Sequence, residues 1–371
     1  MATKMILFLI LILASFFGAH FLLYFSLIKL FAIQSPLARI IIGTALGVLA
    51  ASFVVSSFVT HFIDTPLSRA IYIASGTWVG LLINFLLAML LGWIFFHASD
   101  FFGLSLPIGR LFALLLFMSA CYAAYGIYNA FHPRVKDISV TINNLPENWK
   151  GKTIVQLSDV HLGHIYRKAF LEKVVKEVNG LKPDLVVITG DLFDGMDGNL
   201  EHLTLPLSDL KPRYGTFFIT GNHETYLGVK RTFETLGETP NIRILNDETE
   251  NVGGLQIIGL SYPEREGKKD IPKAFASMEN FQKGLPTVLL YHAPSDISQF
   301  KDFGVNLQLS GHTHKGQLFP FGFIAEMIYG KYYYGLNTEG DYSIYTTNGT
   351  GTWGPPMRTG NTPEIVRIKL N

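Results

Sequence analysis

The sequence predicts a two-part chain: four membrane-spanning helices, followed by an α/β domain with a sheet-rich core. Three observations carry this prediction. The 371 residues are 49% apolar and only 16% charged, with a mean hydropathy of +0.28, which is too apolar for an ordinary soluble domain. The long apolar runs are confined to residues 1–132. From about residue 133 onward, short β-rich runs alternate with amphipathic stretches.

Charge is distributed as unevenly as hydropathy. Residues 1–132 hold five Lys or Arg and two acids, whereas the remainder holds 25 and 27. The net charge of +1 shows no basic excess, so no nucleic-acid partner is indicated. The single cysteine, Cys121, excludes an intrachain disulfide and a thiolate zinc site. We therefore divide the chain into a four-span transmembrane domain at 1–132, a linker with a first strand at 133–150, and an α/β domain at 151–371.

Each of the four apolar runs is 21 to 27 residues long, and about 20 helical residues suffice to cross a bilayer. The runs are Met5–Ile28, Ile40–Thr60, Ala70–Phe96 and Leu111–Phe131. A cleavable signal peptide would have a shorter apolar core of about 7 to 15 residues. A water-soluble bundle would show an apolar stripe, but here every face is apolar. Mid-span positions carry no acid or base beyond His20, which favours an anchor over a transporter.

The even number of spans places the N-terminus and the α/β domain on the same side of the membrane. The basic residues expected on that side are Lys4, Arg69, Arg134 and Lys136, and those expected on the other are Lys29, Arg39 and Arg110. The positive-inside rule then places the α/β domain in the cytoplasm. We expect a multi-pass protein of the inner (cytoplasmic) cell membrane.

The second part begins with a predicted βαβ unit. Thr153–Leu157 and Leu185–Thr189 are continuous apolar runs of strand length, and Phe170–Val178 between them has helical spacing. Further strands are expected at residues 217–220, 255–260, 287–291, 307–309, 342–346 and 365–370.

Polar clusters directly follow five of these strands. Ligands gather beyond the carboxyl ends of strands in α/β sheets, so the five clusters are expected to converge. The candidate metal ligands are Asp159, His161, Asp191, Asn222, His292, His312 and His314. Oxygen and imidazole donors without thiolate suit Mn, Fe or Zn and disfavour a calcium cage. Seven groups exceed the needs of one tetrahedral ion, but they fit two divalent cations that share a bridging carboxylate.

Taken singly, these residues have ordinary structural explanations. A lone His is more often a surface or hydrogen-bonded residue than a ligand, and Asp159 or Asp191 alone could cap a helix. Taken together, the pattern favours ligands, because five of the seven histidines after residue 132 follow apolar strands. His164 and His202 do not, and we expect structural roles for both.

The ordered blocks DVH, GDLFD, GNHE, a His after a strand, and GHTH resemble the calcineurin-like metallophosphoesterase superfamily. The resemblance covers about residues 150–371 and implies a β-sandwich flanked by helices. GHTHKGQLFP and the stretch from Thr347 to Ile365 are similar to a membrane-attached bacterial subgroup. That subgroup includes a peptidoglycan-associated Bacillus phosphoesterase and the chlamydial UDP-diacylglucosamine pyrophosphatase.

The resemblance also implies a role for each residue. One metal would be held by Asp159, His161, Asp191 and His314. The other would be held by Asp191, Asn222, His292 and His312, with Asp191 as the bridge. His223 corresponds to a catalytic histidine that is not a ligand, and Asp194 to the acid that orients it, although a loop carboxylate that caps the next segment is the alternative for Asp194. Two departures, Glu224 for the commoner Asp and Lys315 for a Gly, touch no inferred ligand. Arg358 and Lys315 stay open between a solvated charge and a phosphate contact.

We therefore expect a membrane-anchored hydrolase of phosphodiester, phosphomonoester or pyrophosphate bonds. Two divalent cations, with Mn favoured over Fe and Zn, would make hydroxide available at neutral pH, and His223 would donate a proton to the leaving oxygen. Anchoring favours a lipid-linked substrate, with a phosphorylated small molecule left open. The alternative is a catalytically silent membrane protein with a binding or regulatory role. Such a protein would be expected to have lost some ligands, and none is missing.

Overall fold

The computed structural model describes residues 2–196, 200–264 and 267–371. Met1 of the predicted transmembrane domain, and residues 197–199 and 265–266 of the predicted α/β domain, lie outside the described residues. The chain divides into two compact units. The helical unit is Met1–Tyr128 with Gly354–Met357, and the sheet unit is Asn129–Trp353 with Arg358–Asn371.

The helical unit contains four helices that are long and apolar enough to cross a membrane. They are α1 (Ala2–Leu30), α2 (Pro36–Phe62), α3 (Pro66–Phe101) and α4 (Ile108–Ala130). The four predicted spans are confirmed as helices, and no end differs from the prediction by more than five residues. Ser35 and Thr65 cap α2 and α3, each with a Pro at the first helical position, where no backbone N–H is needed.

Polar side chains inside the helical unit bond to one another. His20, which lies within the first predicted span, accepts a hydrogen bond at Nε2 from Trp78 Nε1 at 3.0 Å. Ser26 Oγ accepts from Trp93 Nε1 at 3.0 Å. Satisfied polar groups of this kind tie helices together in an apolar medium, as expected for an anchor.

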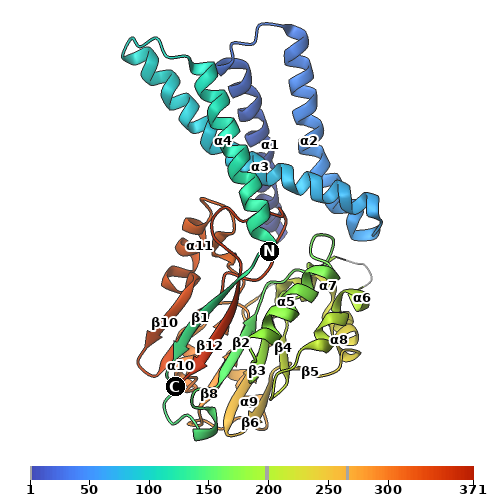
Figure 1. Cartoon of the computed structure of the whole chain (residues 1–371), viewed down its shortest axis with the longest axis vertical. Helices are drawn as coiled ribbons and strands as arrows, with labels where there is room; N and C mark the ends of the chain where they lie inside the picture. The colour runs from blue at the N-terminus through green and yellow to red at the C-terminus, as the bar shows by residue number, and fades with distance from the viewer. Residues whose placement is uncertain (1, 197–199, 265–266) are drawn as a thin grey trace. The chain divides into compact units, whose positions relative to one another are not determined.

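The sheet unit is built from two six-stranded sheets (Figure 1). One has the order β1-β12-β2-β3-β4-β5 and the other β10-β11-β9-β8-β7-β6. The first consists of β1 (Arg134–Val140), β12 (Glu364–Leu370), β2 (Thr153–Leu157), β3 (Leu185–Thr189), β4 (Thr216–Ile219) and β5 (Ile242–Ile244). The second consists of β10 (Gly335–Glu339), β11 (Tyr342–Thr346), β9 (Leu307–Ser310), β8 (Thr287–Leu290), β7 (Leu255–Gly259) and β6 (Glu248–Val252).

Strand periodicity explains the layers, because alternate side chains point to opposite faces. Ile154 of β2 packs in a buried cluster that joins the two sheets, whereas Val155 packs in a second cluster with α5 (Lys168–Gly180). A third cluster covers the outer face of the second sheet with α9 (Ile271–Ser277) and α10 (Ile297–Asp302).

The other helices of the described chain are α6 (Leu200–Thr204), α7 (Asn222–Leu227), α8 (Val229–Gly237) and α11 (Gly322–Tyr329), with short 3-10 turns at Glu147–Trp149, Leu205–Asp209, His314–Gly316 and Gly330–Tyr333. The predicted β-sandwich flanked by helices is confirmed.

Parallel pairing sets the direction of the strands that matter for the site. β2, β3, β4 and β5 run parallel in the first sheet, and β7, β8, β9 and β11 run parallel in the second. The predicted bounds of β2 and β3 are confirmed residue for residue. The sequence did not predict β5, β6 or β10. β6 reads ETENV, and a polar, partly exposed strand of this kind has no apolar run to reveal it.

Candidate metal centre

The carboxyl ends of five strands, from both sheets, meet at one place. His292, after β8, places its Nδ1 2.8 Å from the carbonyl oxygen of Thr189 at the end of β3. The backbone N–H of His312, after β9, donates to Asp159 Oδ1 at 3.0 Å. These contacts join the two sheets at their edge, so the polar clusters that are far apart in sequence become neighbours.

Asp159, His161 and His314 form the first group of candidate ligands. One ligand atom from each lies within 4.8 Å of the others, and all three side chains are buried. His161 Nε2 lies 3.0 Å from His314 Nε2, which in turn lies 3.3 Å from Asp159 Oδ1. The three donor atoms therefore lie close enough together to hold one cation.

Asp191, His292 and His312 form the second group, again with ligand atoms within 4.8 Å of one another. His292 Nε2 lies 3.1 Å from Asp191 Oδ2. Asn222 Oδ1 lies 2.8 Å from His312 Nδ1, so the predicted amide ligand is beside this group. The structure thus brings together all seven side chains that the sequence singled out as ligands. His164 and His202 belong to no candidate metal group among the described residues.

The donor set fits bound divalent cations. Because the carbonyl oxygen of Thr189 occupies Nδ1 of His292, its ring proton is held there and Nε2 is left as the ligand atom. His292 is fully buried, and its Nε2 faces the Asp191 carboxylate at 3.1 Å without a hydrogen bond to any described residue. A cation held between this imidazole and the carboxylate would be bound by both groups.

The backbone of the ligand residues is strained. Five of them have φ between 48° and 73°, in the left-handed region that residues other than Gly rarely adopt. They are Asp159, His161, Asp191, His312 and His314. Gly311 allows the close approach of two of these loops. A Cβ there would lie 2.1 Å from Asp159 Oδ2 and from Ser158 Oγ. Strain of this kind concentrates at functional sites, where the surrounding structure holds it.

His223 lies beside both groups, in contact with Asp194 and His161. Its Nδ1 lies 2.9 Å from the backbone carbonyl oxygen of Asp194 and 4.0 Å from the Asp194 carboxylate. The Asp194 carboxylate is closer to His161 Nδ1, at 3.4 Å. Ligand atoms of these three residues also fall within 4.8 Å of one another. Asp194 therefore contacts His223 through its main chain and faces His161 with its side chain.

Burial and neighbouring charge set the protonation of the centre in the absence of metal. Burial alone would lower the pKa of His292, but the adjacent Asp191 carboxylate outweighs it and raises that pKa to about 10. Burial would raise the pKa of Asp191, but His292 holds it below its usual range. Burial lowers the pKa of His312 to about 3 and also lowers that of His223. It raises the pKa of the Asp194 carboxyl to about 7.

Glu224 supports the centre in a way that the sequence analysis missed. Its buried carboxylate accepts hydrogen bonds from the backbone N–H groups of Asp191, Gly221 and Phe193, at 2.8, 2.6 and 3.0 Å. The expectation that Glu224 touches no inferred ligand is therefore wrong. Its place directly after His223, next to two inferred ligand blocks, was the available signal. The extra methylene relative to Asp lets one carboxylate span three N–H groups of two loops.

Arg358 has neither of the roles weighed from sequence. It is fully buried, donates through Nη1 to the carbonyl oxygen of His314 at 3.1 Å, and lies 3.1 Å from His314 Nδ1 through Nη2. Nη1 also donates to Asn361 Oδ1 at 2.6 Å. The guanidinium therefore fixes both the backbone and the ring of a candidate ligand. Lys315 lies over the ring of Tyr334, with Nζ 4.0 Å from its centre.

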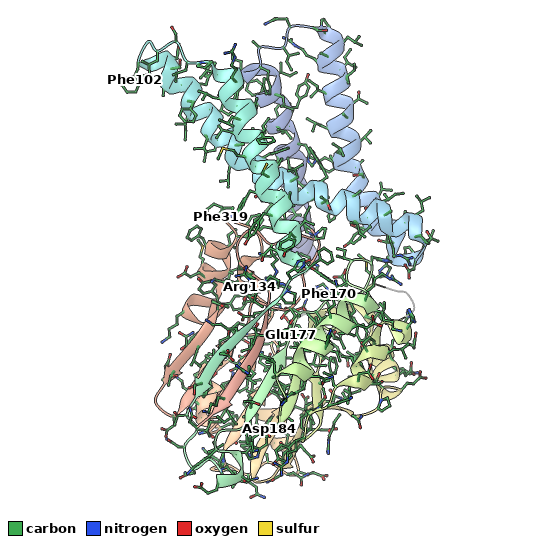
Figure 2. All side chains as sticks on the ribbon, in the orientation of Figure 1. Phe102, Arg134, Phe170, Glu177, Asp184 and Phe319 are labelled. Atoms are coloured by element: carbon green, nitrogen blue, oxygen red, sulfur yellow. The ribbon has the colours of Figure 1, made fainter. Side chains whose placement is uncertain are left out.

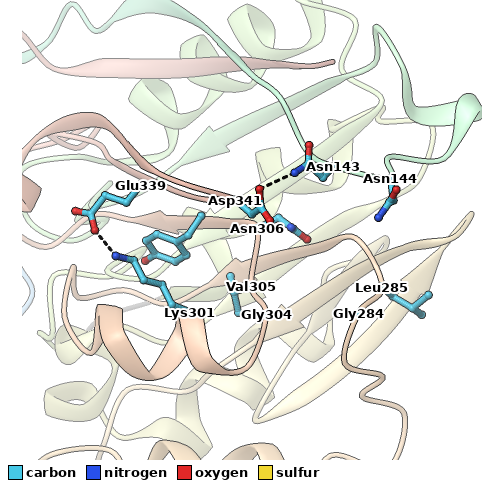
Figure 3. A pocket seen from close by; sticks show the side chains of 11 residues that line it. Asn143, Asn144, Gly284, Leu285, Lys301, Gly304, Val305, Asn306, Glu339 and Asp341 are labelled. Carbon is cyan, nitrogen blue, oxygen red and sulfur yellow. Dashed lines mark hydrogen bonds and ion pairs between the residues drawn. The ribbon is translucent and has the colours of Figure 1, made fainter.

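A separate cavity of about 380 Å³ lies at the opposite ends of the strands (Figure 3). Leu285 and Asn306, which precede β8 and β9, line it together with an ion pair between Lys301 and Glu339. Asn143 Nδ2 donates to Asp341 Oδ1 at 2.7 Å across its rim. None of the candidate ligands lines this cavity, so it is not the metal centre.

Comparisons with known proteins agree with this geometry. The sequence profile of calcineurin-like phosphoesterases matches residues 152–316, which include all seven candidate ligands. A Campylobacter jejuni protein described as an uncharacterized metallophosphoesterase is 33% identical over 273 residues, covering 72% of this chain and 71% of its own. A Helicobacter pylori protein with the same description is 34% identical over 252 residues, covering 66% of each chain. A zebrafish (Danio rerio) transmembrane protein with a metallophosphoesterase domain is 36% identical over 277 residues, covering 69% of this chain and 62% of its own.

Proposed function

This chain belongs to the calcineurin-like phosphoesterase family, and from that premise we propose that it is a membrane-anchored phosphoesterase that depends on two metal ions. It would hydrolyse a phosphodiester, phosphomonoester or pyrophosphate bond. The observation that carries the proposal is the convergence of seven oxygen and imidazole donors, from five strand ends, into two adjacent groups. A catalytically silent protein would have no need to keep this complete set.

The donor set divides between two sites. Asp159, His161, Asp191 and His314 would hold one cation, and Asp191, Asn222, His292 and His312 would hold the other. Mixed oxygen and imidazole donors suit Mn²⁺, Fe²⁺ or Zn²⁺, and we favour Mn²⁺. Bound cations would supply positive charge that polarises a phosphoryl group and makes water more acidic.

His223 is the residue proposed to move a proton. The carbonyl oxygen of Asp194 occupies its Nδ1, so Nε2 is the atom available for exchange with the leaving oxygen. Burial lowers the pKa of His223, which makes the protonated ring a stronger acid. The Asp194 carboxylate would act through His161, holding the tautomer and orientation of that ligand, in addition to its main-chain contact with His223.

The four apolar helices favour a substrate held in or at the bilayer, because a dissolved phosphate ester needs no anchored enzyme. A lipid-linked phosphate or pyrophosphate is the leading candidate, and a phosphorylated small molecule is the second. We propose that the chain spans the inner (cytoplasmic) membrane with the sheet unit on the cytoplasmic side, on the basis of the one-charge bias of its basic residues. Labelling of a Glu147→Cys variant by an impermeant maleimide on intact cells would contradict this orientation.

The test uses the full chain in detergent or nanodiscs, stripped of metal and supplied with Mn²⁺. We expect hydrolysis of bis-p-nitrophenyl phosphate, and loss of that activity in Asp191→Ala. Glu172→Ala, an exposed acid on α5, is the matched control and should retain full activity. Undiminished turnover by Asp191→Ala would exclude the proposed centre. Mn²⁺ binding without turnover of any phosphate ester would favour the silent binding protein.

A further inference from the structure

Exposed apolar side chains of the sheet unit are concentrated in one short segment. Among the described residues of this unit, ten large apolar or aromatic side chains are exposed, and six of them fall within residues 319–328. We call these six the α11 apolar surface: Phe319, Phe321, Phe323, Ile324, Met327 and Ile328. Met327 is 83% exposed and Ile328 66%, so the segment presents a continuous apolar surface to its surroundings.

Helical geometry separates the faces of α11. At about 100° per residue, Phe323, Met327, Ile324 and Ile328 fall on one arc of about 140°, and Ala325 lies outside it. Ala325 is buried in the sheet unit, whereas the four side chains of the arc are exposed. Glu326, the one acid of the helix, lies at the flank of the arc. The exposed face is therefore apolar along this arc, with the exposed Glu326 at one edge.

Strand direction tells which end of the sheet unit carries this surface. β1 is parallel to β12, and β12 is antiparallel to β2, so β1 begins where β2 ends. The chain consequently enters the sheet at the end that holds the metal centre. Phe319 and Arg134, the first residue of β1, lie at this same end (Figure 2).

Hydrogen bonds within the sheet unit place the end of the last apolar helix at that end too. Ala130, the last residue of α4, accepts at its carbonyl oxygen from Tyr166 Oη at 2.9 Å. Asn129 Nδ2 donates to the carbonyl oxygens of Arg358 and Asn361 at 3.0 and 2.8 Å.

The segment that leads into α11 bonds to the same stretch. The N–H of Gly360 donates to the carbonyl oxygen of Gln317 at 2.9 Å, and the N–H of Phe319 to Thr359 Oγ1 at 3.3 Å. The α11 apolar surface therefore starts next to the residues that receive the end of a membrane-spanning helix.

We propose that the α11 apolar surface inserts into the lipid surface of the same bilayer that α1 to α4 cross. Lipid fits better than a protein partner, because the last apolar helix ends at Ala130 and β1 begins at Arg134, at this same end of the sheet unit. Tyr329 and the Tyr332–Tyr334 run follow the apolar arc, and Tyr side chains favour the boundary between hydrocarbon and headgroups.

Insertion has a consequence for the proposed function, on which this step rests. α11 begins eight residues after His314, and the Tyr329 ring centre lies 5.9 Å from that of His312. A helix embedded at the boundary would hold the His312–His314 loop at the depth of the headgroups. Phosphate groups of lipids lie at that depth, so the surface would select lipid phosphates over dissolved ones.

The test measures contact with acyl chains directly and does not depend on catalysis. Two variants are made in a Cys121→Ser background: Met327→Cys, and Glu147→Cys as the control. Each carries an environment-sensitive fluorophore on its single cysteine. The full chains are reconstituted, one per disc, into nanodiscs of phosphatidylcholine and phosphatidylglycerol. Glu147 is exposed and precedes β2, at the opposite end of the unit. We expect lipids brominated in the acyl chain to quench the label at 327 several-fold more strongly than the label at 147.

Equal quenching at the two positions would overturn the proposal. A label at 327 in an apolar environment that brominated lipids do not quench would also overturn it, because a protein surface would then cover α11. The double variant Phe323→Ser with Met327→Ser links insertion to substrate choice. It should hydrolyse bis-p-nitrophenyl phosphate at the rate of the parent and a phospholipid phosphate at least several-fold more slowly. Loss of both activities in the double variant would instead indicate that the metal centre is damaged. If the parent protein itself hydrolyses neither substrate, the proposed function is contradicted, and the quenching result still decides whether α11 inserts.

Discussion

The carboxylate of Glu224 accepts a hydrogen bond from the backbone N–H of Asp191 at 2.8 Å, and so holds the loop of the proposed bridging ligand. Glu224→Gln should weaken metal binding about 10- to 100-fold, because an amide presents a donor where three N–H groups need acceptors. Competition with a chelating dye would measure the affinity. Glu224→Asp keeps the charge but shortens the side chain, and its metal affinity should lie between those of the parent and Glu224→Gln. An unchanged affinity in Glu224→Gln would show that the loop holds its shape without this carboxylate.

Gly311 should tolerate no side chain. The Cβ of Gly311→Ala would collide with Asp159 Oδ2 and Ser158 Oγ, each at 2.1 Å, so the variant should lose about 1–3 kcal/mol of stability and bind metal at least 10-fold more weakly. Thermal unfolding and metal content by mass spectrometry test both expectations. Gly237→Ala is the matched control, because its new Cβ meets no atom within 4 Å. Equal behaviour of the two variants would contradict the packing argument.

His223 should matter most when the leaving group is poor. His223→Ala should slow hydrolysis of an alkyl phosphate ester about 10² to 10⁴-fold, because an alkoxide needs a proton as it leaves. The loss should be smaller for a p-nitrophenyl ester, whose leaving group is weakly basic. Metal content should stay near normal. Loss of both metals would make His223 a ligand, and an equal rate loss for both esters would argue against proton donation.

In the metal-free protein, the ion pair between His292 and Asp191 should stabilise the fold most in mildly acidic solution. The pKa of His292 is raised to about 10, so its contribution to stability is complete below the unfolded value of about 6.5 and is lost as pH rises towards 10. The pKa of Asp191 is lowered, so its contribution is complete above about 3.9 and is lost in stronger acid. The contribution of this pair, measured as the difference in thermal unfolding midpoint between the metal-free parent and Asp191→Asn, should therefore be largest between these values and shrink on the alkaline side. A difference that grows from pH 7 to pH 9 would contradict this account.

Sequence alone determined the parts of the chain whose signal is local. The four apolar helices, the bounds of β2 and β3, and the identity of seven candidate ligands could be read from apolar runs and from the polar residues that follow them. Each of these depends on a few consecutive residues. A buried strand must be apolar along its length, and a long apolar run favours lipid over water.

Tertiary structure decided which of these residues meet. The pairing of β2 with β12, the separation of strands into two sheets, and the contact of Glu224 with the Asp191 loop join residues far apart in sequence. The Asp194 carboxylate faces His161 more closely than His223, although Asp194 was assigned to His223 from its position in the motif. Hydrophobic patterning specifies which face of a strand is buried, but not its neighbour or the rotamer of a buried acid. Those follow from packing and hydrogen bonding of the whole chain at once.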